Sequence, residues 1–289
     1  MDTWKADAWH AVSKPPTGTP LGWVFVSEPA ASPDAPGVQP TGAGAAAAGI
    51  RDRRGVVSFV RRSPRMNPSQ QRALASLADR YLVELPRADL ATSIAVDATF
   101  DDVRVFGRRA PLIVEIGCGV GDSLVPMAAA RPETNLLAFE VYSPALASTM
   151  GKLDRAGVPN VRLMQADGSQ GLRILVTPGA LHELWTFFPD PWQKKRHHKR
   201  RLVNPEFAAL AASRLAPRGL WRLATDWDDY ANWMREVLDA TPGLGNVYAD
   251  APGGWAPRPA ERPITRFERR GLAAGRTVRD LVYRRVGDD

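Results

Sequence analysis

Cysteine is almost absent from this sequence, which has 289 residues and a single thiol, Cys118. One cysteine cannot form an intramolecular disulfide, and it supplies too few thiolates for a structural zinc or iron–sulfur site. The sequence also has no stretch of 18 or more strongly apolar residues, which argues against a membrane-spanning helix. Its first residues lack the basic and then apolar order of a secretion signal. We therefore expect a cytoplasmic protein that binds neither a metal nor a membrane.

The histidines also do not predict a metal site. The chain has four of them. His197 and His198 are adjacent, and adjacent side chains point in different directions on a helix or a strand. With no third ligand nearby, the pair lacks the spacing of a metal site. We predict packing or phosphate contacts for both.

Positive charge is concentrated in two short runs. The formal net charge is +7. Residues 51–65 contain six arginines and one acid, and residues 194–201 contain six cations and no acid. The summed charge of the two runs exceeds the net charge of the whole chain, so the remaining residues carry a net negative charge. Such runs neutralise phosphates without reading base sequence, so they predict a nucleic-acid partner whose binding weakens with salt.

The first 50 residues are rich in proline, alanine and glycine and have little apolar periodicity. Such a segment buries too little apolar surface to fold, so residues 1–50 are predicted to be a disordered extension. Residues 51–289 are predicted to form one domain, which begins with the basic segment 51–66. Apolar residues at helical spacing follow Asn67 and Ser69, and either of these two could cap an amphipathic helix.

Short apolar runs alternate with helical patterns from Pro111 onward. This alternation predicts an α/β fold with a parallel, doubly wound sheet. The predicted strands are Leu112–Ile116, Leu136–Val141, Val161–Gln165, Leu184–Phe188 and Leu220–Ala224, followed by a terminal strand over Val278–Val286.

A glycine-rich loop follows the first predicted strand. Gly117, Gly119 and Gly121 would let the backbone turn tightly and approach a ligand, and the next helix would present free N–H groups. A dinucleotide fingerprint needs a third glycine at the position of Asp122, whose charge would face a pyrophosphate, so the loop argues against NAD. Glu115 instead suits a cofactor with a positive charge near the loop, such as the ammonium of S-adenosylmethionine.

Acids also end the next two predicted strands. Glu140 follows the second strand, where doubly wound folds place an acid on an adenosine ribose. Asp167 follows the third strand and could accept from the adenine amine. A solvated carboxylate explains any one of these acids, but three successive strand ends favour one cofactor pocket.

The segment Phe187–Arg201 follows the fourth strand, beside the point where doubly wound sheets bind ligands. Its prolines restrict the backbone around Asp190, and Trp192 offers a face for stacking a base. Six cations follow directly. Further along, Asp226 ends the fifth strand, and Thr265–Gly271 mixes a hydroxyl, an acid and cations before the terminal strand.

Together these segments resemble the bacterial tRNA (guanine-N7)-methyltransferase family. The glycine loop alone indicates only a class I methyltransferase, whereas Phe-Pro-Asp-Pro-Trp with its basic tail is highly specific. The resemblance runs from about residue 55 to the end. The matching pieces are residues 58–66, 115–121, 188–197, 225–227 and 265–271.

The resemblance implies a Rossmann-like class I sheet, mostly parallel with an antiparallel terminal strand. It implies transfer of a methyl group from S-adenosyl-L-methionine to N7 of guanine 46 in the tRNA variable loop. The implied cofactor contacts are Glu115, Gly117, Gly119, Gly121, Glu140, Asp167 and Asp190, and the implied tRNA contacts are Lys194, Asp226, Thr265, Arg266, Phe267 and Glu268.

Guanine N7 has a free lone pair at neutral pH, so its methylation needs no strong general base. We therefore expect Asp190 to act as a positioning and electrostatic group, and Asp226 and Glu268 to accept from guanine N1–H and the 2-amino group. Two alternatives stay open: a class I methyltransferase for another base or for protein, and an RNA-binding protein with a vestigial pocket. The sequence does not distinguish a monomer from a homodimer. It also leaves open whether the basic segment 51–66 contacts RNA or covers the cofactor.

Overall fold

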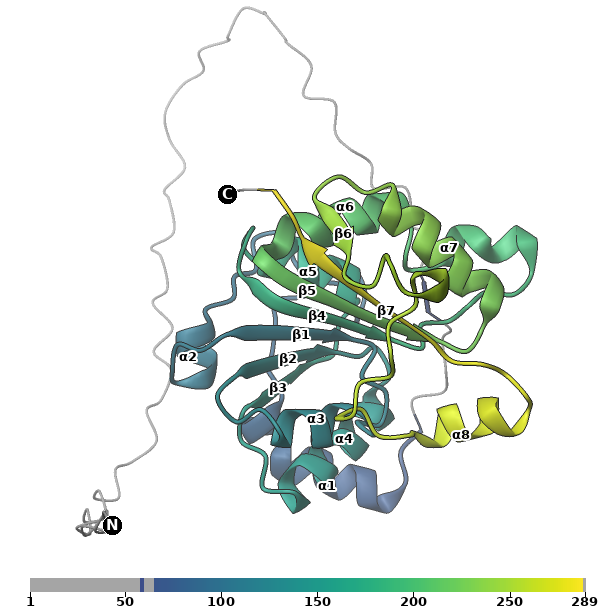
Figure 1. Ribbon diagram of the computed structural model, residues 1–289. Coiled ribbons are helices and arrows are strands. Elements are labelled where there is room, and N and C mark those ends of the chain that lie inside the picture. The colour runs from purple at the N-terminus through teal and green to yellow at the C-terminus, as the bar shows by residue number, and fades with distance from the viewer. Residues whose placement is uncertain (1–57, 60–64, 288–289) are drawn as a thin grey trace, which may run out of the picture. The chain divides into compact units, whose positions relative to one another are not determined.

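A computed structural model describes residues 58–59 and 65–287 of the chain (Figure 1). The predicted extension 1–50 and most of the basic segment 51–66 lie outside these residues. Residues 65–287 form a seven-stranded sheet with helices on both faces. Within this part of the chain, no helix has the length and apolar character that crossing a membrane requires.

The sheet has the strand order β3-β2-β1-β4-β5-β7-β6. Neighbouring strands are parallel from β3 to β5, whereas β7 runs antiparallel to both β5 and β6. This confirms the doubly wound sheet and its antiparallel terminal strand. The strands are β1 (Leu112–Ile116), β2 (Asn135–Phe139), β3 (Val161–Met164), β4 (Leu181–Phe187), β5 (Leu215–Thr225), β6 (Leu244–Asn246) and β7 (Arg279–Arg285).

The central strands are continuous apolar runs because helices cover both faces of the sheet. Ile113 of β1 packs with Leu146 in one core cluster, and its neighbour Val114 packs with Leu172 and Phe207 in the other. Figure 1 shows α1, α3 and α4 on the first face and α5, α6 and α7 on the second. The helices are α1 (Pro68–Tyr81), α2 (Asp102–Phe106), α3 (Leu124–Ala129), α4 (Ser143–Arg155), α5 (Gly168–Leu175), α6 (Pro205–Arg214), α7 (Asp228–Asp239) and α8 (Arg266–Ala273), with 3₁₀ turns η1 (Lys195–Arg200) and η2 (Pro252–Gly254).

Local capping explains where the helices begin. Asn67 caps α1 by accepting from the Gln70 amide at 2.9 Å, and the Gln70 side chain accepts from the Asn67 amide. This confirms one of the two predicted caps. Helix α5 was not predicted, because its glycines at 168 and 171 weaken the helical pattern. The Asp167 cap before it is the signal that could have revealed it.

The order of connections places a crevice beside β1. The chain first builds outward through β2 and β3, and it then returns to form β4 on the other side of β1. At such a switch point, the loops after the strands diverge and leave space at the carboxyl edge of the sheet.

Candidate functional site

One large cavity lies at the carboxyl ends of the parallel strands, at the switch point between β1 and β4. Its volume is about 630 Å³, within the range of roughly 300–1,000 Å³ that is common for small-molecule sites. The loops that follow β1, β2, β3, β4 and β5 all contribute to its lining. Two segments that are distant in the sequence, Ser58–Phe59 and the start of α8, complete it.

The glycine loop lines the cavity in a conformation that requires glycine. Gly117, Gly119 and Gly121 have φ angles of 80°, 56° and 76°, which residues with a Cβ rarely adopt. A Cβ on Gly121 would also lie 2.8 Å from Thr149. Cys118 is buried, and burial raises the pKa of its thiol well above the ordinary value. It is therefore a packing residue and not an activated nucleophile.

Glu115 is a buried carboxyl within β1, with 3% of its surface exposed. Its Oε2 atom is buried and has no hydrogen-bond partner among the residues that the structure describes. Burial, and secondly the charge of Glu140, raise the pKa of Glu115 to about 8. Because an unpaired buried carboxyl is costly, this position fits a ligand with a cationic group, such as the ammonium of S-adenosylmethionine.

The acids after β2 and β3 line the cavity and also hold the local backbone. Glu140 accepts from the amides of Gly119 and Tyr142, both at 2.9 Å. Asp167 Oδ1 accepts from two amides in the first turn of α5, at 2.8 and 3.1 Å. Both acids therefore have fixed positions at the cavity wall.

The loop after β4 presents Asp190 to the same cavity. Two non-glycine residues of this loop, Phe188 and Trp192, have φ angles of 52° and 47°. The Phe188 amide donates to the carbonyl of Ala224 in β5 at 2.7 Å, which anchors the turn. Left-handed backbone at non-glycine residues is uncommon and clusters at functional sites.

Trp192 contacts two side chains of the basic run and the backbone at Ser58. The Arg200 guanidinium lies 3.8 Å from the centroid of its ring, and His197 packs against the ring edge-on at 5.9 Å. The indole N–H donates to the carbonyl of Ser58 at 3.0 Å. The side chain therefore joins the loop to the segment at Ser58, and stacking of a base on its ring stays a prediction.

Not all six cations of the basic run face solvent. Arg201 is 2% exposed, pairs with Asp229, donates to the carbonyl of Pro191 at 3.0 Å and stacks on Tyr230. It is therefore a structural residue, which corrects the expectation that the whole run binds phosphate. Residues 194–196 are exposed and lie beside the loop that carries Asp190.

The far end of the cavity is lined from β5 and α8. Asp226 follows β5, and its Oδ2 accepts from the Nε of Arg276 at 2.7 Å. Thr265 caps α8, and its hydroxyl accepts from a helix amide at 3.1 Å. Phe267 is 51% exposed and meets Phe188 edge-on at 5.5 Å. These side chains line the part of the cavity on the β5 side of the loop that carries Asp190, and we call this part the second compartment.

Glu268 is buried and does not line the cavity, and its expected contact with guanine stays a prediction. It is 1% exposed and pairs with Arg258 and with the fully buried Arg262. Arg262 also pairs with Asp280 of β7 at 2.8 Å and lies 5.3 Å from the ring centroid of Phe188. This buried cluster connects α8 to β7 and to the loop after β4.

The structure brings together most of the predicted site residues. Lys194, Arg266, Gly121 and Glu268 lie outside the cavity lining, the first two on exposed positions. The residues in the lining are Glu115, Gly117, Gly119, Glu140, Asp167, Asp190, Asp226, Thr265 and Phe267.

Comparisons with known proteins agree with this geometry. The Methyltransf_4 family, described as "Putative methyltransferase", matches residues 109–281. A tRNA (guanine-N(7)-)-methyltransferase of Cutibacterium acnes is 58% identical over 246 residues, which cover 85% of this chain and 89% of the relative. The chain belongs to the tRNA (guanine-N7)-methyltransferase family. This confirms the resemblance that the motifs indicated.

Further relatives carry the same name. One from Nocardioides sp. is 50% identical and covers 82% of this chain and 90% of its own length. One from Aromatoleum aromaticum is 46% identical and covers 81% of this chain and 85% of its own length. The family match thus extends over nearly the full length of several relatives.

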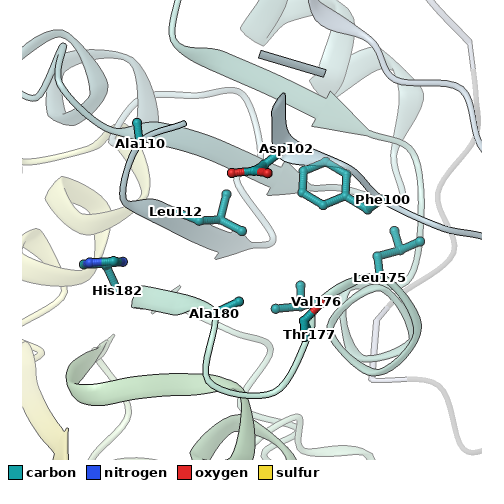
Figure 2. A pocket seen from close by; sticks show the side chains of 9 residues that line it. All are labelled: Phe100, Asp102, Ala110, Leu112, Leu175, Val176, Thr177, Ala180 and His182. Carbon is teal, nitrogen blue, oxygen red and sulfur yellow. The ribbon is translucent and has the colours of Figure 1, made fainter. Parts of the chain in front are cut away.

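A smaller cavity of about 160 Å³ lies at the opposite edge of the sheet, near the starts of β1 and β4 (Figure 2). Its only ionisable lining side chains are Asp102 and His182, which lie apart in Figure 2. In the described part of the chain, no three His, Cys, Asp or Glu side chains are grouped so that they could hold a metal ion. The large cavity, by contrast, is lined by several acids, among them Glu115, Glu140, Asp167, Asp190 and Asp226.

Arg276 lines the large cavity and was not predicted from the sequence. Arg276 lies in a stretch without a motif, and only its position after Thr265–Gly271 could have suggested it. Ser58 and Phe59 line the cavity although they belong to the basic segment. The sequence left open whether this segment contacts RNA or covers the cofactor, and the position of these two residues favours the second alternative.

Proposed function

We propose that this chain methylates N7 of guanine 46 in the tRNA variable loop. S-adenosyl-L-methionine is its methyl donor and supplies an electrophilic methyl group on a sulfonium. The observation that carries the proposal is the single cavity, which continues from an unpaired buried carboxyl at Glu115 to Asp226 and Phe267, with exposed cations beside it. A tRNA substrate also favours the cytoplasm as the location.

Each end of the cavity has a separate task in this proposal. Glu115, Glu140 and Asp167 hold the cofactor, with Glu115 opposite its ammonium and the other two opposite the adenosine. The glycine loop lets the backbone approach it closely. Asp190 lies between the two compartments, where N7 and the methyl carbon must meet.

Orientation supplies most of the rate enhancement. N7 attacks through its lone pair, so no residue has to remove a proton. Positive charge moves from sulfur to the purine, and only the difference between the two positions counts. For a carboxylate ~4 Å from the purine and ~6 Å from sulfur, at an effective dielectric of ~20, this difference is about 1.4 kcal/mol. Alignment of the reactants, worth roughly 7–11 kcal/mol, must supply the larger part.

Nucleoside analysis tests the proposed function directly. Transfer RNA is incubated with the purified protein and S-adenosylmethionine, and its nucleosides and their positions are then mapped. We expect N7-methylguanosine at position 46 of the variable loop. Methylated adenine, methylated protein or no methylated product would contradict the proposal.

Replacing Asp190 by alanine is expected to lower the single-turnover rate of methyl transfer about tenfold, because it removes the electrostatic preference for the purine cation. Binding of tRNA is expected to change little, since the phosphate contacts lie elsewhere. Asp250→Ala, at an exposed site outside the cavity, is the matched control. An unchanged rate in Asp190→Ala would remove this residue from the site.

Replacing Lys194, Lys195 and Arg196 together by alanine is expected to weaken tRNA binding. The slope of log affinity against log salt should become less steep by about two to three units, since each phosphate contact releases counterions. The measurement is a salt titration of tRNA binding. The control replaces Arg104 and Arg109, exposed cations that precede β1 at the opposite edge of the sheet. An equal change in both proteins would exclude η1 as the specific RNA contact.

A further inference from the structure

Asp226 and Arg276 form a hydrogen-bonded pair in the wall of the second compartment. Arg276 Nε donates to Asp226 Oδ2 at 2.7 Å, and both residues line the cavity. Asp226 is 8% exposed, whereas the Arg276 side chain is 36% exposed. The carboxylate is thus held deep in the wall, and the guanidinium reaches further toward the opening.

The packing around the pair leaves it little freedom. The backbone amide of Arg276 donates to the carbonyl of Gly271 at 3.0 Å, which fixes the chain just after α8. A Cβ on Gly271 would lie 2.5 Å from Asp226 Oδ2. Glycine at this helix position is therefore what allows α8 to approach the carboxylate.

The pair has hydrogen-bonding capacity left over. Among the described residues, Asp226 Oδ1 and the terminal nitrogens of Arg276 have no hydrogen-bond partner. An ionised carboxylate only accepts, and a guanidinium only donates. The wall therefore offers a hydrogen-bond acceptor next to hydrogen-bond donors.

Aromatic side chains close the same compartment. Phe267 is about half exposed and meets Phe188 edge-on. A base that is taken out of its stack needs such an apolar surface for its face, and polar groups for its edge. The aromatic pair supplies the first and Asp226–Arg276 the second.

We propose that the Asp226–Arg276 pair reads the Watson–Crick edge of the substrate guanine. The Arg276 guanidinium donates to O6, and Asp226 accepts from N1–H and the 2-amino group. Adenine has a donor at C6 and a bare N1, so it would place donor against donor and acceptor against acceptor. This assignment rests on the proposed function, and it gives Arg276 the recognition role for which the buried Glu268 is not placed.

The test combines enzyme variants with altered bases at the target position of tRNA. 6-Thioguanine replaces O6 by sulfur, a weak acceptor, and keeps N1–H, the 2-amino group and N7. We expect Arg276→Ala to lower kcat/KM on guanine tRNA by about 10- to 100-fold and on 6-thioguanine tRNA by less than about threefold. For Asp226→Asn, the loss of kcat/KM should be smaller on inosine tRNA than on guanine tRNA, because inosine lacks the 2-amino group that Asp226 would accept from.

Arg279→Ala is the matched control, because Arg279 also pairs with an aspartate, Asp228 at 3.2 Å, but does not line the cavity. It should leave kcat/KM unchanged on every tRNA. Arg276→Lys keeps the charge beside Asp226 and is used if the alanine variant does not fold. Lysine lacks the planar fork, so it should also lose most of the preference for guanine over 6-thioguanine.

An equal loss on guanine and 6-thioguanine tRNA would overturn the assignment of Arg276 to O6. In that outcome the wild-type protein still forms N7-methylguanosine, so the proposed function would stand. Absence of N7-methylguanosine with the wild-type protein on unmodified tRNA would overturn both.

Discussion

Replacing Glu115 by glutamine is expected to weaken S-adenosylmethionine binding about 100-fold at pH 7. Loss of one partner of a buried ion pair costs roughly 3–5 kcal/mol. At pH 7 about 1.4 kcal/mol of this is offset, because the wild-type carboxyl, with a pKa of about 8, must first lose a proton. Roughly 2–4 kcal/mol remains, and each 1.4 kcal/mol is a factor of ten.

Calorimetry in buffers of different ionisation enthalpy separates this mechanism from simple misfolding. Wild-type protein should release about one proton per bound cofactor at pH 7, because the carboxyl is protonated when free and ionised against the ammonium. Glu115→Gln should release none. Its melting temperature without ligand should stay close to wild type at pH 7, since glutamine replaces a largely neutral carboxyl of the same shape. The exposed Glu133→Gln is the control, and equal proton release in all three proteins would contradict the prediction.

Replacing Arg262 by methionine is expected to lower the free energy of unfolding by roughly 3–5 kcal/mol at pH 8. The guanidinium is fully buried and pairs with both Glu268 and Asp280, so its loss leaves Asp280 without its ion-pair partner in the core and Glu268 with Arg258 alone. Denaturant unfolding at fixed pH measures the effect. A loss below about 1 kcal/mol would mean that solvent reaches the cluster after the substitution.

The loss should be smaller at pH 5 than at pH 8. Burial raises the pKa of Asp280 to about 6 although Arg262 lies against it. A raised folded-state pKa means that the stability contribution is present below the unfolded pKa and is lost as the pH rises through the folded one. Without Arg262 the folded pKa rises further, so ionised Asp280 costs more at pH 8. Adding Asp280→Asn to Arg262→Met should therefore restore part of the stability at pH 8 and little at pH 5.

The part of the cavity wall that we propose holds the cofactor was predictable because its signals are local. Gly117, Gly119 and Gly121 must adopt positive φ values within one short loop, and this need is visible in the spacing. Glu140 and Asp167 follow apolar runs that form parallel strands, and parallel strands bring their carboxyl ends to one edge. The spacing of apolar residues and the order of the strands along the chain therefore locate these acids without knowledge of any long-range contact.

The region around β5 and α8, which we propose binds the substrate, depends on contacts between residues that are distant in the sequence. No local pattern reports such contacts. Glu268 lies one turn into α8, and only the position of Arg262 and β7 decides that it turns into the core. Arg276 enters the cavity because the chain folds back onto Gly271 after that helix. Arg201 is similar, since its burial follows from its contact with Asp229 of α7. Residue type alone does not show which of these charged side chains line the cavity and which are buried in the core.

The hydrogen bond from Trp192 to Ser58 spans 134 positions of the chain. Ser58 and Phe59 thus form part of the cavity wall. They precede the region that the family model matches, which starts at residue 109. A fragment trimmed to residues 109–281 would keep β1 to β6 and only the start of β7, and it would lack the part of the cavity wall that Ser58 and Phe59 supply. We therefore expect the active enzyme to need residues on the N-terminal side of the matched region, in addition to those that form the sheet.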